Sequence, residues 1–242
     1  MNTQKYITLA ALVCCAVLFQ NFAFVDALKV NMIPVNEKVR SNHARELLGK
    51  KYKGSQAQSV ERSSNLGSAL FNDVYKNLPK KFKSASAELT TTLLAEADKY
   101  EIDPVFLVAV IKTESSFNPL IHGSFGEIGL MQVKPDTAQW ISKKYGIKWK
   151  GAKALEKPSY NVRIGAAYFH WLREKFDGHA NKYLSAYNMG ALNVHRMYAA
   201  AKTPKEYSLR VMKKYEDTYK RLAMLTNLNS ANHMIAENSP LL

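Results

Sequence analysis

Cysteine is scarce in this chain, and metal-binding histidine patterns are missing. The two cysteines, Cys14 and Cys15, are adjacent, so they cannot build a disulfide framework or a four-ligand zinc cluster. The six histidines include no His-x-x-x-His pair, the spacing that places two imidazoles on one helical face. No serine lies in a nucleophile-elbow motif, and the glycines at 123, 126 and 129 lack the dinucleotide-binding spacing. We therefore expect no metal, no cofactor and no thiol chemistry.

Acidic residues are also in the minority. The 242 residues include 34 Lys and Arg against 20 Asp and Glu, a net charge of +14 with His neutral. Such an excess predicts a polyanionic partner, which could be nucleic acid, an anionic membrane surface or an acidic polymer of the cell envelope. No zinc finger and no aromatic-basic RNA-binding string accompanies the charge, so nucleic acid is not expected.

The apolar run near the N-terminus is too short for a typical membrane span. It extends over residues 6–19 after Lys5 and is interrupted by Gln20 and Asn21, whereas a span needs about 20 apolar residues. With the small residues before Leu28, this pattern predicts a signal peptide over residues 1–27 and export to the periplasm or beyond, without stable membrane insertion afterwards. A retained anchor and a lipoprotein site are the alternatives; cleavage would remove both cysteines.

Residues 28–85 have a different composition from the rest of the chain. They hold 12 Lys and Arg against 4 Asp and Glu, a net of +8, with polar clusters and the predicted start of one helix near residue 66. The pattern predicts a basic, partly disordered N-terminal arm that is drawn to an anionic surface. At the other end, residues 228–242 are expected to form a polar tail.

Residues 86–227 show dense helical periodicity and no alternating pattern typical of strands. The sequence therefore predicts an all-α domain, in which Asp103-Pro104 begins a helix that is apolar on every face and ends before Asn118-Pro119. Thr203 to Glu206 resembles a capping box and predicts the start of the last helix. Further helices are expected over residues 86–101, 135–145, 161–176, 180–188, 192–202 and 203–225.

Glu114 is the most informative charged residue of this domain. It lies three, four and seven residues after Ile111, Val110 and Leu107, so it shares their helical face. A carboxyl group in apolar surroundings is desolvated, which raises its pKa and lets it keep a proton to donate near neutral pH. The alternative is a glutamate that turns to solvent at the end of its helix.

Three strings favour the catalytic interpretation. They are Glu114-Ser115-Ser116-Phe117-Asn118-Pro119, then Gly126-x-x-Gly129-Leu130-Met131-Gln132, then Ala186-Tyr187-Asn188-x-Gly190. In this order they resemble the signatures of the soluble-type lytic transglycosylase domain, a goose-type-lysozyme-like family that cleaves peptidoglycan. The resemblance covers about residues 87–219 and includes a helix start at residues 157–168.

The resemblance implies a lysozyme-like helical domain with one catalytic acid and base, Glu114. It also implies a set of substrate-binding or site-shaping residues: Ser115, Met131, Gln132, Tyr187, Asn188 and Tyr207. Purely structural roles stay open for several of them, since Met131 could be core, Ser115 could bond back to helix carbonyl groups, and either tyrosine could simply pack. The implied partner is the peptidoglycan glycan strand, and a secretion, conjugation or appendage machine is a further candidate.

The sequence departs from the family pattern at three positions. Glu127 replaces a commonly small residue, Gly123 replaces a common serine, and Thr203 replaces a common glutamate, which weakens the assignment of Tyr207. The implied reaction uses one carboxyl group and yields a 1,6-anhydromuramoyl end. Two rivals remain: a hydrolytic muramidase in which Glu127 positions water, and a wall-binding module without turnover.

Overall fold

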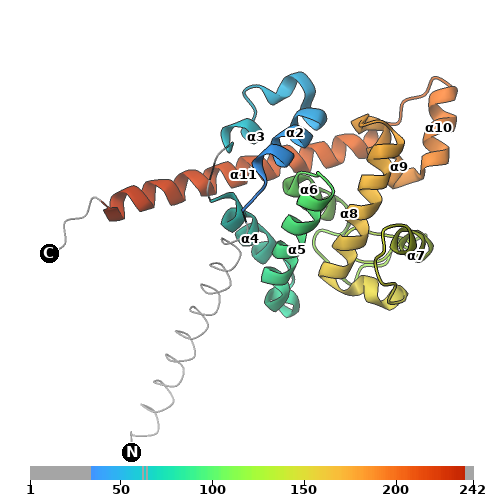
Figure 1. Cartoon of the computed structure of the whole chain (residues 1–242), viewed down its shortest axis with the longest axis horizontal. Helices are drawn as coiled ribbons and strands as arrows, with labels where there is room; N and C mark the ends of the chain where they lie inside the picture. The colour runs from blue at the N-terminus through green and yellow to red at the C-terminus, as the bar shows by residue number, and fades with distance from the viewer. Residues whose placement is uncertain (1–33, 62, 64, 238–242) are drawn as a thin grey trace, which may run out of the picture.

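The computed structural model describes residues 34–61, 63 and 65–237, with side chains as far as Thr226. The predicted signal peptide, both cysteines and residues 238–242 lie outside this part. The described residues form α-helices and short 3-10 helices, plus two isolated bridges, His122 with Ile128 and Ile128 with Val133 (Figure 1). The helices are α2 (Glu37–Leu48), η1 (Gly49–Tyr52), α3 (Gln56–Ser59), α4 (Leu66–Asn77), η2 (Lys80–Ala85), α5 (Ser86–Lys99), α6 (Pro104–Glu114), α7 (Pro135–Lys144), η3 (Ala152–Glu156), α8 (Pro158–Lys175), α9 (Ala180–Met189), α10 (Ala191–Ala199) and α11 (Glu206–Glu237).

Helix α6 is the centre of the fold. Asp103 caps its N-terminus by accepting a 2.8 Å hydrogen bond from the backbone N–H of Val105, and Pro104 occupies the first turn. Every residue from Pro104 to Lys112 is buried, as expected for a helix that is apolar on all faces. The all-α class and this central buried helix are thus confirmed, and α6 ends at Glu114, slightly earlier than predicted.

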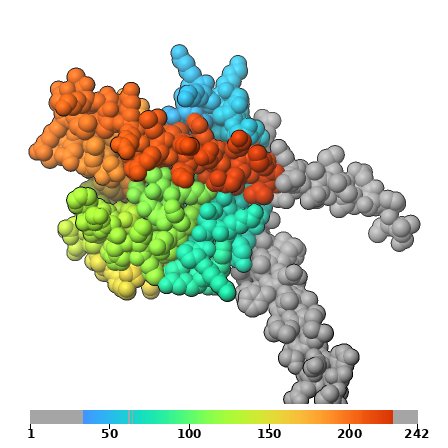
Figure 2. Space-filling view, turned by 180° about the vertical axis from the view of Figure 1, so that it is seen from behind, coloured from blue at the N-terminus to red at the C-terminus, as the bar shows by residue number. Residues whose placement is uncertain are grey.

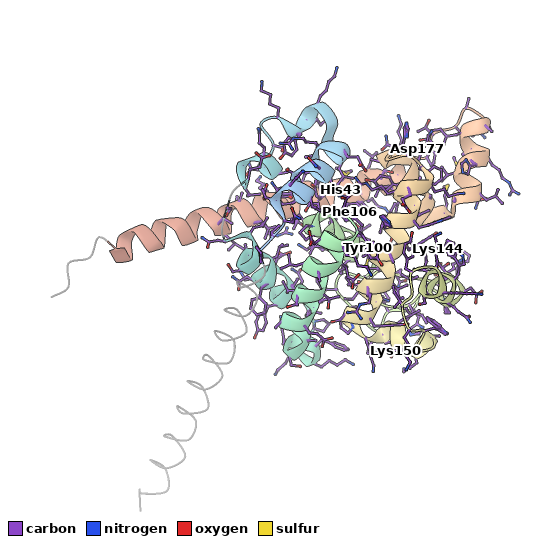
Figure 3. The ribbon with its side chains drawn as sticks, viewed as in Figure 1. His43, Tyr100, Phe106, Lys144, Lys150 and Asp177 are labelled. Atoms are coloured by element: carbon purple, nitrogen blue, oxygen red, sulfur yellow. The ribbon has the colours of Figure 1, made fainter. Side chains whose placement is uncertain are left out.

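The N-terminus of α6 is anchored by helices from both ends of the chain. The carboxylate of Asp103 accepts hydrogen bonds of 2.6 Å from both Tyr215 and Tyr219 of α11. Its backbone N–H donates to His43 of α2 at 3.0 Å, and the His43 ring packs edge-on against Phe106 with 5.1 Å between centroids (Figure 3). These contacts fix the position of α6 and therefore of the residue at its other end.

The expected disordered arm is not found in the described residues between 34 and 85. Helix α4 starts where predicted, but Leu66, Leu70 and Val74 are buried in the same core as α6. In α2 the guanidinium of Arg40 is buried and donates to the hydroxyl of Tyr219 at 2.6 Å. The prediction was wrong because composition counts such residues as polar, although hydrogen bonds allow them to be buried inside the fold.

Helix α11 begins later and ends later than predicted. Thr203 is exposed and the helix starts at Glu206, so the capping-box prediction was wrong. Instead, the carbonyl oxygen of Pro204 accepts a 3.0 Å hydrogen bond from Ser185 of α9, which ties down the segment before the helix. At the far end the helix continues to Glu237, so much of the predicted polar tail is helical.

Helix α11 spans the molecule. It packs on α6, α3, α4 and α9, and Figure 2 shows it crossing one face between the N-terminal helices and the middle of the chain. Helices α7, α8 and α9 lie to the right of α6 in Figure 1, away from α2, α3 and α4, and α8 packs against α5. Within the described residues, no helix is long and apolar enough to cross a membrane.

Candidate functional site

Glu114 lies at the C-terminus of α6 and faces a cavity of about 490 Å³. A volume of this size is typical of small-molecule sites. Residues from five segments line what we call the Glu114 cavity: Glu114, Ser124, Phe125, Glu127, Gln132, Val133, Lys134, Thr137, Tyr168, Tyr187, Asn188, Met189 and Gly190. The structure therefore brings together Glu114, Gln132, Tyr187 and Asn188, as the sequence predicted.

Tyr207 contacts Glu114 directly. Its buried hydroxyl donates a hydrogen bond to Oε1 of Glu114, and this contact connects the start of α11 to the end of α6. The guanidinium of Arg210, one turn later, lies 5.8 Å from the ring centroid of Tyr207. The assignment that was weakest from sequence thus makes a direct hydrogen bond to the carboxyl group.

The pKa of Glu114 is raised from 4.5 to about 7. Burial is the largest cause, because the charged form loses hydration, and the negative charge of Glu127 acts in the same direction. The hydrogen bond from Tyr207 and the positive charge of Arg210 oppose the rise. Near neutral pH this carboxyl group is therefore present in both protonation states, so it can both donate and accept a proton.

Tyr187 also lines the Glu114 cavity. Its ring stacks on Phe169 with 3.9 Å between centroids and 6° between planes, and the ring of Tyr168 is 5.2 Å away. The hydroxyl of Tyr187 donates to the carbonyl oxygen of Met131 at 2.7 Å. Tyr187 thus holds the loop that carries Gln132.

The loop between α6 and α7 is fixed by Asn161 of α8. This buried side chain donates to the carbonyl oxygens of Ile128 and Leu155 and accepts from the N–H of Met131, each at 2.8 Å. Gly129 has a φ of +81°, and a Cβ there would lie 2.3 Å from the Leu155 carbonyl oxygen. Only glycine fits this close approach, which places Gln132 beside the cavity.

Two predicted substrate-binding side chains do not reach the cavity. Met131 is fully buried, and its sulfur fills the space beside Gly165 of α8. The hydroxyl of Ser115 is buried between the carbonyl oxygens of Ile111, at 3.1 Å, and Leu130, at 2.8 Å. Both side chains therefore pack within the protein in this structure, and substrate binding by Ser115 or Met131 stays a prediction.

Glu127 and Gly123 are spatial neighbours. A Cβ on Gly123 would come within 2.4 Å of Oε2 of Glu127, so the missing serine side chain makes room for the larger acidic one. The Glu127 carboxylate accepts a 3.0 Å hydrogen bond from the N–H of Phe125 and lies 3.5 Å from Nζ of Lys134. It forms the outer wall of the cavity and is partly exposed.

Sequence reasoning missed Tyr168, Arg210 and the anchoring role of Asn161. The motif at residues 157–168 contains two of them, but its spacing does not show that one end enters the cavity while the other fixes a loop. Arg210 lies one turn after Tyr207, a signal that depends on knowing where α11 packs. Among the described residues, no group of three or more His, Cys, Asp or Glu side chains is arranged to hold a metal ion.

Comparisons with known proteins agree with the motifs. Residues 91–210 match the family model described as the transglycosylase SLT domain. Membrane-bound lytic murein transglycosylase C of Histophilus somni is 38% identical over 111 residues, which are 42% of this chain and 31% of that protein. The soluble lytic murein transglycosylase of Salmonella typhimurium is 29% identical over 118 residues, 48% of this chain and 18% of that protein.

In each of these relatives the matched region is only part of the protein. Membrane-bound lytic murein transglycosylase E of Buchnera aphidicola is 29% identical over 127 residues and is covered to 57% of its length. Among solved structures, the lytic transglycosylase Slt of Pseudomonas aeruginosa superimposes with a TM-score of 0.47 at 20% identity, over 70% of this chain and 31% of the other. Because the match covers 31% of the Histophilus somni protein, the chain spans less than a third of that relative's length.

Proposed function

We propose that this chain, which matches the transglycosylase SLT domain family over residues 91–210, belongs to that family and is a peptidoglycan lytic transglycosylase. The observation that carries the proposal is Glu114: a single carboxyl group with its pKa raised to about 7, held by Tyr207 at the wall of the cavity. A group that is protonated in part of the population near neutral pH can act first as an acid and then as a base.

The proposed reaction cleaves the β-1,4 bond between N-acetylmuramic acid and N-acetylglucosamine. The Glu114 carboxyl group donates its proton to the glycosidic oxygen as the bond from that oxygen to the muramoyl C1 breaks. The resulting carboxylate then takes a proton from the 6-hydroxyl of the same muramoyl ring, and that oxygen bonds to C1. The product carries a 1,6-anhydro ring, Glu114 is protonated again, and no water is consumed.

Tyr207 and Gln132 have supporting roles in this proposal. The Tyr207 hydroxyl stabilises and orients the carboxylate between the two proton transfers, because a hydrogen bond to a charged acceptor is stronger than one to a neutral acceptor. Gln132, with a φ of +48°, is held by its side-chain N–H groups on the carbonyl oxygens of Ile121 and Gly129. Its amide oxygen is thereby oriented by the loop. The muramoyl 6-hydroxyl, which is the nucleophile of this proposal, belongs to the same ring as C1, so no second reactant has to be bound.

Hydrolysis assisted by Glu127 is the rival reaction. Glu127 is close enough for its charge to raise the pKa of Glu114, but its two carboxylate oxygens already interact with Phe125 and Lys134. A base that activates water needs a free lone pair directed at that water, and these two contacts already determine how the Glu127 carboxylate is oriented. These contacts favour the reaction with one carboxyl group.

Digestion of purified peptidoglycan in heavy-oxygen water, followed by mass spectrometry, separates the alternatives. The proposal predicts anhydromuramoyl ends without the heavy isotope, whereas hydrolysis yields reducing ends that carry it. Glu114→Gln is expected to abolish release, and Glu127→Gln to keep the anhydro product. Reducing, labelled ends would refute the transglycosylase reaction, and an inactive parent that binds the wall would favour a binding module.

We further propose that the protein acts outside the cytoplasm, where its substrate lies. This rests on the predicted signal peptide at residues 1–27. N-terminal sequencing of the envelope-fraction protein is expected to begin at Leu28, and a start at Met1 would indicate a retained segment. Service to a secretion, conjugation or appendage machine stays a proposal of the same kind, which co-purification with such a machine would test.

A further inference from the structure

The three tryptophans of the chain are grouped around α7 and α8. Trp140 is on α7, Trp149 follows that helix, and Trp171 is on α8. Trp140 is 42% exposed, which is unusual for so large an apolar side chain. A second cavity of about 640 Å³, the tryptophan cavity, is lined by Asp136, Gln139, Trp140, Lys143, Ile147 and Trp149.

An aromatic surface connects this cavity with the Glu114 cavity. On α7, Thr137 lines the Glu114 cavity and Trp140, three residues later, lines the tryptophan cavity; residues at this spacing are neighbours on a helix. On α8, Tyr168 lines the Glu114 cavity and stacks with Trp171 at 6.1 Å and 12°. The rings of Trp140 and Trp171 meet edge to face at 4.7 Å, so the two helices carry one continuous strip.

The chemistry of this strip suits a sugar chain. The C–H bonds on one face of a pyranose ring carry partial positive charge, and they are attracted to the negative face of an aromatic ring. The exposed side chains of Asp136, Gln139 and Lys143 surround Trp140 and Trp149, and they offer both donors and acceptors to ring hydroxyl groups. Lys143 adds a positive charge for a strand that carries lactyl and peptide carboxylates.

We propose that the tryptophan cavity is a second glycan-binding site, which holds a segment of the same strand whose scissile bond lies at Glu114. This inference rests on the proposed function, because it takes that substrate as its ligand. The aromatic strip indicates that a single glycan strand occupies both cavities, because a strand that leaves the Glu114 cavity past Tyr168 would next contact Trp171 and then Trp140. Strand length then determines affinity, since only a long strand reaches both cavities.

The test measures binding of peptide-free glycan strands to the inactive Glu114→Gln variant. Trp140→Ala is expected to weaken binding of long strands roughly tenfold, the usual scale for loss of a central aromatic contact. Binding of a tetrasaccharide fragment should be unchanged, which also shows that the fold is intact. Tyr75→Ala is the matched control, since Tyr75 is 41% exposed on α4 and should change neither affinity.

A second variant keeps the test independent of local packing between the rings. Lys143→Ala leaves all three tryptophans in place and should weaken long-strand binding about threefold, a loss typical of a partly exposed charged contact. Unchanged long-strand affinity in both variants, or equal losses for long and short ligands, would overturn the second site. The proposed function is judged separately, by whether the parent cleaves the tetrasaccharide.

Discussion

Replacing Glu114 by glutamine should stabilise the protein at high pH and leave its stability unchanged at low pH. The folded state holds the Glu114 proton up to about pH 7, whereas the unfolded chain releases it near 4.5. Between these pH values the folded state binds more of the Glu114 proton than the unfolded state, so the contribution of Glu114 to the free energy of unfolding falls as the pH rises. Glutamine has the same shape and is never charged, so this loss is absent from the variant.

The size of the effect follows from the pKa difference. A rise from 4.5 to about 7 corresponds to about 3 kcal/mol, at about 1.4 kcal/mol for each pH unit. Residual contact with solvent screens the carboxylate, so this is an upper value. At pH 8 the variant should exceed the parent by up to this amount, and at pH 4, where both states of the parent are protonated, the two should agree.

Urea unfolding followed by circular dichroism at pH 4 and pH 8 measures this difference. Glu216→Gln provides the control, because Glu216 is exposed on α11 and should show the same small effect at both values. The m-value should stay constant between parent and variant, so that a shift in midpoint reports stability. An equal effect of Glu114→Gln at both pH values would refute burial as the cause of the raised pKa.

Two further predictions address the supports of the site. Tyr207→Phe removes a hydrogen bond to the charged form of Glu114, so the upper pKa in a pH profile of kcat/KM should rise by about one unit; an unchanged or lower value would contradict the structure. Arg40→Met removes the buried partner of Tyr219 and should lower stability by about 3–5 kcal/mol in thermal unfolding. The same change at the exposed Arg45, whose ion pair is on the surface, should lower stability by under about 1 kcal/mol. A loss for Arg40→Met that is as small as the loss for Arg45→Met would mean that the N-terminal helices are not part of the core.

The central helix could be predicted closely, because its determinants are local. Asp103 and Pro104 are adjacent cap residues, and the apolar residues after them fill every face of α6. The position of Glu114 one turn beyond this block was enough to predict burial and a raised pKa. Thr203 shows the limit of the same reasoning: its cap motif is complete in sequence, yet the helix starts at Glu206, after a segment whose Pro204 carbonyl oxygen accepts a hydrogen bond from Ser185.

Residues far apart in sequence decide which side chains enter the cavity. Ser115 and Met131 belong to the same motifs as Glu114 and Gln132, but their side chains are buried and do not line the cavity. A motif shows which residue type occurs at a position. Whether that side chain faces a ligand or the core depends on the backbone turn around it. For the same reason Tyr168, which belongs to the α8 motif, could not be identified as a cavity residue.

By itself, the sequence determined an all-α domain, a buried helix with a carboxyl group at its end, and a resemblance to the lytic transglycosylase family, because periodicity, capping and short motifs are local. The tertiary structure decided that Tyr207 contacts Glu114, that Gly123 makes room for Glu127, and that the basic N-terminal segment caps the core. Net charge could not reveal the last of these, because it counts Arg40 without showing that a buried tyrosine from α11 accepts its hydrogen bond.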